Sequence, residues 1–201
     1  MNELLLYIVD LVEKMGYIGI FLMTFIEGTL IPIPNEITLI PAGFLVSKGE
    51  FNFWILLIIS AAGNVMGSMT SYYVAFKYGR NALLRYGKYF FFDDKKMQKM
   101  ESFFQKHGPF SVFIGRIAPG IKHFISFPPG LAQMDFKKFF IYSSLGGTLW
   151  VLILILIGIT IGNNQDLINY YVEKMNYIIF FLVIFVIIFY IRYNKIKKNN
   201  Q

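Results

Sequence analysis

The sequence contains no cysteine, so it can form neither a disulfide bond nor a thiolate metal site or nucleophile. Its two histidines, His107 and His123, lie too far apart to indicate a metal site. No Ser/His/Asp arrangement and no paired carboxylates indicate hydrolysis, so an enzyme is not predicted and no cofactor is implied.

Charged residues make up only 15% of the 201 residues, whereas soluble proteins average about a quarter. An ordinary soluble domain is therefore excluded.

The residues that dominate instead are hydrophobic, at 56%, with 18% aromatic. Three apolar stretches approach the roughly 20 residues that a helix needs to cross a bilayer. They cover residues 53–76, 139–161 and 177–191, and the last would depend on its flanking residues. The sequence predicts an all-α polytopic membrane protein.

Basic residues give the chain a net charge of +7, and they cluster after the first and last apolar stretches. Such clusters normally mark the cytoplasmic side and attract anionic lipid headgroups. No basic module interleaved with aromatic residues is present, so nucleic-acid binding is not predicted. The two clusters contain Lys77, Arg80, Arg85, Lys88, Lys95, Lys96, Lys99 and Lys106, then Arg192, Lys195, Lys197 and Lys198.

The flanking segments follow from the same patterns. Residues 1–15 place charged side chains on one helical face and apolar ones on the other, which predicts an amphipathic helix in the membrane interface rather than a signal peptide. Residues 93–107 predict a surface helix on the cytoplasmic leaflet. Residues 163–192 predict a C-terminal transmembrane helix, and residues 193–201 a basic cytoplasmic tail.

Two further apolar segments, 17–46 and 109–133, are interrupted by prolines. The first contains Pro32, Pro34 and Pro41, and the second contains Pro109, Pro119, Pro128 and Pro129. Because irregular backbone at membrane depth needs protein or a water cavity around it, we expect each segment to enter the membrane and return on the same side. Each broken segment followed by a span would then form one of two inverted halves. The alternative is a single kinked helix in each place.

Both broken segments carry charge. The first contains Glu27 and Glu36, and the second contains Arg116 and Lys122. A cation at bilayer depth normally faces a partner or a water-filled cavity, and the two carboxylates are candidate partners. The alternatives are that the cations extend to the cytoplasmic surface and that Glu36 lies in a solvated outer loop.

These motifs, taken together over about residues 16–162, resemble the DedA family, also described as the VTT or SNARE-associated membrane-protein domain. In the first broken segment the motifs are residues 25–28 and 32–36. The first apolar stretch and the residues after it carry motifs at 63–67 and 72–80, and the second broken segment carries motifs at 113–122 and 127–134. The resemblance implies two re-entrant hairpins that meet in the membrane. It also implies transport of undecaprenyl phosphate across the cytoplasmic membrane for reuse, or phospholipid scrambling in eukaryotic relatives.

The resemblance also suggests roles for the charged residues. Arg116 and Lys122 would bind the lipid phosphate, and Glu27 and Glu36 would couple transport to the proton motive force. Many relatives carry arginine where this chain has Lys122, which lacks the bidentate fork of a guanidinium. The helix breaks and two glycines, Gly115 and Gly120, would bring backbone N–H groups towards the anion.

Two residues are weaker candidates for support of the site: Asn64, by a hydrogen bond across to a hairpin, and His123, as a proton relay.

Two functions of other classes stay open, a proton-coupled small-ion antiporter and a non-transporting membrane scaffold. Gly-x-x-x-Gly pairs at Gly63/Gly67 and Gly158/Gly162 permit helix association within one chain or in a homo-oligomer. The expected partners are a polyprenyl-phosphate lipid, protons and membrane lipids, in a bacterial cytoplasmic membrane.

Overall fold

The computed structural model describes residues 3–29, 31, 34–86, 102, 108–118, 122 and 125–163, and all secondary structure in this part of the chain is helical. The helices are α1 (Glu3–Gly28), α2 (Glu36–Ser47), α3 (Phe53–Tyr86), α5 (Phe110–Ile117), α6 (Phe127–Leu131) and α7 (Phe136–Gly162). The third apolar stretch, the predicted C-terminal helix and the basic tail lie outside the described residues. So does the predicted surface helix, apart from Ser102.

Helix α1 consists of two helices joined at Gly16. The backbone of Gly16 has φ 59° and ψ −166°, a combination that glycine adopts far more readily than other residues. Before this break, Ile8, Val9 and Val12 are buried in the main hydrophobic core, whereas Asp10 is exposed. The segment 1–15 is thus separated from the following helix by a sharp change of direction, and its position in a membrane interface stays a prediction.

Helices α3 and α7 are the two membrane-span candidates in the described part of the chain. The apolar parts, Phe53–Gly79 and Phe136–Gly162, have 27 residues each, which corresponds to about 40 Å of helix. Both begin at side-chain caps: Asn52 Oδ1 accepts from the backbone N–H of Trp54, and Asp135 Oδ1 accepts from that of Lys138. The two predicted spans therefore form helices that extend beyond the predicted ranges.

Each proline-containing segment holds two helices instead of one kinked helix. The first is interrupted between Gly28 and Glu36, and the second between Ile117 and Phe127. Pro128 lies in the first turn of α6, where a missing N–H costs little. Pro41 differs from the expectation, because it lies inside α2 and is fully buried there. It does not break the segment; the interruption lies before α2.

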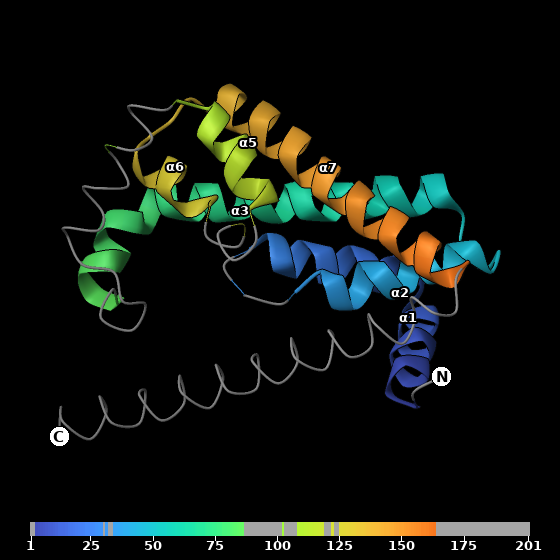
Figure 1. Ribbon diagram of the computed structural model, residues 1–201. Coiled ribbons are helices and arrows are strands. Elements are labelled where there is room, and N and C mark those ends of the chain that lie inside the picture. The colour runs from blue at the N-terminus through green and yellow to red at the C-terminus, as the bar shows by residue number, and fades with distance from the viewer. Residues whose placement is uncertain are drawn as a thin grey trace, which may run out of the picture.

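The packing of the other helices against α3 and α7 is preserved when the two halves of the molecule are exchanged (Figure 1). In the first half, α1 packs against α3, the span of its own half, and α2 packs against α7. In the second half, α5 packs against α7, the span of its own half, and α6 packs against α3. Helices α3 and α7 also contact each other directly. Each pair of shorter helices thus bridges the same two long helices.

Glycines allow the closest of these helix contacts. A Cβ at Gly67 of α3 would collide with the backbone of Phe25 and Gly28 in α1, and a Cβ at Gly158 of α7 would collide with the backbone of Ile40 and Gly43 in α2. Small residues let helix backbones approach in this way. The other glycine of each predicted Gly-x-x-x-Gly pair, Gly63 and Gly162, also meets α1 and α2, so both pairs are used within the chain.

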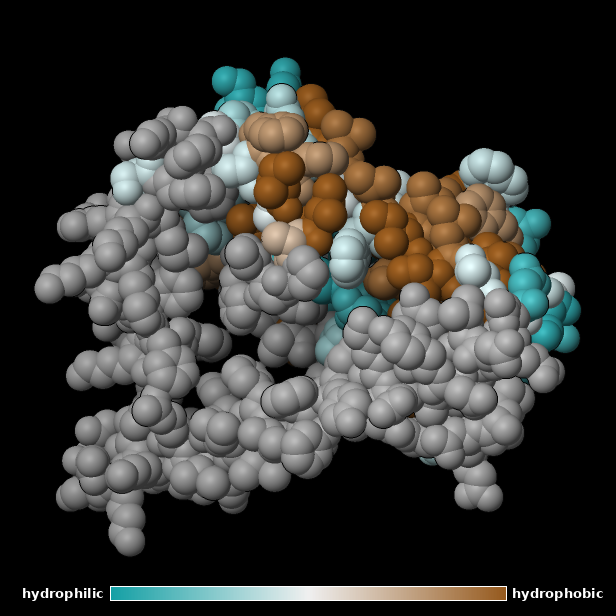
Figure 2. Space-filling view, viewed as in Figure 1, coloured by the Kyte–Doolittle hydropathy of each residue, from teal (hydrophilic) through white to brown (hydrophobic). Residues whose placement is uncertain are grey.

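The outer surfaces of α5 and α7 are apolar. Figure 2 shows hydrophobic side chains covering the visible face over α5 and α7. Exposed large hydrophobic residues on these two helices are Phe110, Ile114, Phe140, Ile141, Leu145, Leu149 and Leu156. An apolar surface of this kind suits contact with lipid.

Candidate functional site

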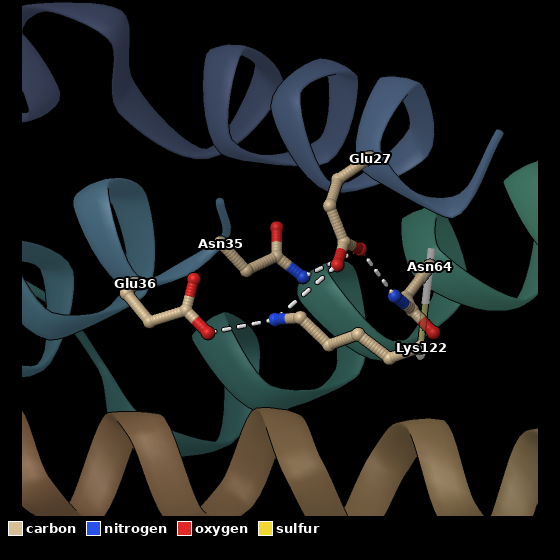
Figure 3. Close-up of polar contacts among 5 residues, drawn as sticks. All are labelled: Glu27, Asn35, Glu36, Asn64 and Lys122. Atoms are coloured by element: carbon tan, nitrogen blue, oxygen red, sulfur yellow. Dashed lines mark hydrogen bonds and ion pairs between the residues drawn. The ribbon is translucent and has the colours of Figure 1, made fainter. Parts of the chain in front are cut away.

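The carboxylate of Glu27, in the last turn of α1, lies at the centre of a buried polar cluster (Figure 3). Its Oε2 accepts hydrogen bonds from Asn35 Nδ2 and Asn64 Nδ2, each at 2.8 Å. Its Oε1 lies 3.5 Å from Lys122 Nζ. Glu27, Asn35 and Asn64 are all at least 96% buried. Three separate parts of the chain therefore converge on one carboxylate.

Lys122 joins the two broken segments. Its ammonium lies 2.7 Å from Glu36 Oε1 and 3.5 Å from Glu27 Oε1, so it bridges the two acids of the first segment. The same nitrogen lies 4.8 Å from the ring centroid of Trp150 on α7, within the range of a cation–π interaction. Lys122 is 5% exposed and Glu36 is half-buried at the start of α2. Neither residue occupies the surface position that the alternative interpretation gave it.

Arg116 lies in the last turn of α5 and is 4% exposed. One guanidinium nitrogen donates a hydrogen bond to Ser126 Oγ, and the charge interacts electrostatically with Glu27. The Nε atom has no hydrogen-bond partner among the described residues, and no ion pair within 4 Å is found for Arg116 there. Lys122 is held by carboxylates, whereas Arg116 keeps donor capacity.

Helix α7 closes this cluster with two consecutive glycines. A Cβ at Gly146 would lie 2.8 Å from Arg116 Cβ, and a Cβ at Gly147 would lie 2.5 Å from Asn64 Oδ1. Any larger residue at either position would displace one of these side chains. The absence of side chains at Gly146 and Gly147 therefore lets α7 approach Arg116 and Asn64.

Four charges, two of each sign, meet at this site, and those of Glu27, Arg116 and Lys122 are buried. Buried ions are costly unless they are paired and hydrogen-bonded, and intramembrane ionisable residues usually mark a pathway for a substrate or ion. The arrangement is suited to an anion that binds the remaining donors and to proton transfer on the carboxylates. No group of three or more metal-ligating side chains occurs among the described residues.

The structure brings together five of the residues that the sequence nominates: Glu27, Glu36, Asn64, Arg116 and Lys122. Gly115 is inside α5, where the side chain of Ile125 fills the space that a Cβ would need. The two other candidates, Gly120 and His123, lie outside the described residues.

Three partners in the cluster were not predicted. Asn35 is the residue before α2, a position that suggests only a helix cap, yet its side chain bonds to Glu27. Ser126 and Trp150 have no local signal beyond their place in or beside apolar sequence. Only the packing of distant segments identifies them.

Comparisons with known proteins place the chain among membrane proteins. The family model described as VTT domain matches residues 33–160. An uncharacterized membrane protein of Bacillus subtilis, YbfM, is 32% identical over 153 residues, which cover 76% of this chain and 94% of that protein. Undecaprenyl phosphate transporter A of Bacillus subtilis is 33% identical over 166 residues, which cover 83% of this chain and 82% of that protein. The Staphylococcus aureus protein of the same name is 28% identical over 191 residues, which cover 92% of this chain and 94% of that protein. No solved structure gives a significant match.

Proposed function

This chain belongs to the VTT domain family, and from that premise we propose that it is a membrane transporter that moves undecaprenyl phosphate between the leaflets of a bacterial cytoplasmic membrane. Two of its relatives carry the name undecaprenyl phosphate transporter A. The observation that supports the proposal best is Arg116, a buried guanidinium whose Nε–H has no hydrogen-bond partner in the described part of the chain, beside a lysine that carboxylates already hold. A lipid phosphate is an anion that such a group binds well.

In this proposal the two broken segments, 17–46 and 109–133, are re-entrant hairpins of inverted orientation. The exchange-symmetric packing of α1 and α2 with α5 and α6 supports that arrangement, since inverted repeats commonly place a transport site at their interface. The membrane domain covers 16–162. It is preceded by the interfacial helix 1–15, and followed by a transmembrane helix at 163–192 and a cytoplasmic basic tail at 193–201.

Protons enter the proposal through Glu27 and Glu36. In the structure Lys122 contacts both carboxylates and Arg116 interacts electrostatically with Glu27, so the two cations balance the two carboxylates. When a phosphate approaches Arg116, it adds negative charge to a buried region, and protonation of one carboxylate restores the balance and releases Lys122 towards the phosphate. A proton gradient would in this way bias the direction of lipid movement.

The test is reconstitution of the full chain in liposomes that contain undecaprenyl phosphate, with movement between leaflets measured with and without a pH gradient. We expect movement by the wild type and at least a tenfold loss for Arg116→Gln, because the glutamine keeps polarity but loses the charge. Thr160→Ala, at an exposed hydroxyl that donates to Leu156 O on α7, is the control and should transport normally.

Other outcomes separate the alternatives. Gradient-driven ion movement without any lipid movement would overturn the proposal in favour of an antiporter. A charge exchange, Glu36→Lys with Lys122→Glu, restores a structural ion pair but not a phosphate site. Full activity in that exchanged protein would overturn the phosphate-binding role of Lys122.

A further inference from the structure

Six buried polar side-chain atoms have no hydrogen-bond partner among the described residues, although buried polar groups in proteins are nearly always bonded. They are Ser60 Oγ, Asn64 Oδ1, Arg116 Nε, Ser143 Oγ, Ser144 Oγ and Trp150 Nε1. Three of the six, Ser143, Ser144 and Trp150, belong to α7. All except the Asn64 oxygen can donate a hydrogen bond.

Two of these donors lie on the α7 face that meets the charged cluster. Ser143 and Trp150 are spaced from Gly146 and Gly147 at i, i+3, i+4 and i+7, so all four occupy one side of the helix. On that side Gly146 contacts Arg116, Gly147 contacts Asn64, and the Trp150 ring faces Lys122. Ser143 is 3% exposed. Both donors therefore lie on the face of α7 that meets Arg116 and Lys122.

The geometry also brings the two donors towards each other. Seven residues separate Ser143 from Trp150, or about 10 Å of helix axis. A long side chain on a helix leans towards the N-terminus, so helix geometry leads us to expect that the Trp150 indole extends over the glycine turn in the direction of Ser143. The glycines supply no side chain between them. Arg116 reaches the same turn from α5.

From this convergence we infer that Ser143 and Trp150 form, with Arg116, an anion-binding subsite in which α7 donates to the oxygens of a phosphate monoester. The inference rests on the proposed function and deepens it by adding two substrate-contacting residues. An indole N–H and a guanidinium N–H can only donate, so a metal cation or ammonium would find no ligand in them. A phosphate oxygen accepts from all three groups.

The chain offers a direct probe, because it contains only two tryptophans. Trp54 is 67% exposed at the start of α3, so Trp54→Phe leaves Trp150 as the single tryptophan of the full chain, which can be excited selectively over the tyrosines. This protein, in nanodiscs of phosphatidylcholine and phosphatidylglycerol, is titrated with undecaprenyl phosphate, with undecaprenol and with inorganic phosphate. We expect a saturable change in Trp150 emission with undecaprenyl phosphate and none with the neutral alcohol.

The same titration tests Ser143 and Arg116. Ser143→Ala in the Trp54→Phe protein should raise the half-saturating concentration about tenfold, the loss that one hydrogen bond to a charged group produces. Arg116→Gln should abolish saturation. Thr160→Ala is the matched control on α7 and should leave the titration unchanged. An unaltered titration in Ser143→Ala would overturn the role of Ser143.

The outcomes separate this inference from the proposed function. If the Trp54→Phe protein translocates undecaprenyl phosphate but Trp150 emission responds to neither phosphate compound, the inference fails and the proposed function stands. A response to inorganic phosphate alone supports the anion subsite and overturns the lipid as its substrate. Trp150→Phe retains an aromatic face for Lys122 but loses the N–H. Wild-type transport in that variant would overturn the donor role of Trp150.

Discussion

Lys122 Nζ lies 2.7 Å from Glu36 Oε1, although the two residues are 86 positions apart in the chain. This ion pair links the start of α2 to the break between α5 and α6, so it connects the two halves of the molecule at the point where both are interrupted. Lys122 also lies 3.5 Å from Glu27 Oε1. A change at this one nitrogen therefore affects both acids and both halves.

We expect Lys122→Met to destabilise the protein by about 3–5 kcal/mol, because it leaves buried carboxylates without their cation. Thermal unfolding of the purified protein in detergent, followed by circular dichroism, measures this. In Lys122→Met/Glu36→Gln much of the loss should be recovered, since one of the unpaired charges is also removed.

The exposed pair of Lys14 and Asp10, at 2.8 Å, is the control for this experiment. Lys14→Met should leave the unfolding temperature unchanged, because solvent screens an exposed pair. Equal effects of Lys14→Met and Lys122→Met would contradict the assignment of Lys122 as a buried, paired cation.

The two amides that hold Glu27 should each contribute to stability. Asn64→Ala removes one donor to Oε2 at 2.8 Å, and we expect a loss of about 1–3 kcal/mol. Asn35→Ala removes the second donor at the same distance. Because both amides bind one oxygen, the double substitution should depart from additivity, which urea unfolding of the four proteins tests. Asn163→Ala, at an exposed position after α7, should have no effect.

The contact of α1 with α3 should not tolerate a methyl group at Gly67. The new Cβ would collide with the backbone oxygen of Phe25 and the backbone of Gly28, and backbone atoms cannot rotate away. We expect Gly67→Ala to cost about 1–3 kcal/mol in thermal unfolding. At Gly79 on the same helix, a Cβ meets chiefly a terminal methyl of Leu131, which can move. Gly79→Ala should therefore be nearly neutral, and comparable losses at both glycines would count against the close α1–α3 packing.

Tyr72 anchors α3 to the turn before α7. Its hydroxyl donates to the backbone oxygen of Met134, and its ring stacks on Phe139 at 4.5 Å between centroids. Tyr72→Phe keeps the ring but leaves the oxygen of Met134 without this donor, so we expect a loss of about 1 kcal/mol. Tyr73→Phe, at the exposed neighbouring position, gives the baseline. No difference between the two variants would contradict the proposed anchor.

Much of the architecture follows from local sequence. The long apolar stretches predict α3 and α7, because a run of about 20 apolar residues is stable only inside a membrane or a large core. Proline-rich breaks with charged residues beside them locate both interrupted segments. Pro41 shows the limit of that reasoning: its position after the first turn of α2 is compatible with the helix, and local sequence alone does not distinguish a tolerated proline from a break.

For the candidate site, too, one part follows from the sequence and another part only from the tertiary structure. The sequence by itself determined that the chain is an all-helical membrane protein. It also determined that two carboxylates and two cations lie in interrupted apolar segments. Both conclusions follow from the sequence because hydropathy and charge are properties of each residue and its neighbours. Only the tertiary structure decided that Lys122 pairs with Glu27 and Glu36, and that Asn35 and Trp150 join the cluster. It also decided that the Arg116 Nε–H has no partner within the described ranges. These contacts depend on how α1, α3, α5 and α7 pack, and packing brings together residues between which the sequence carries no local signal.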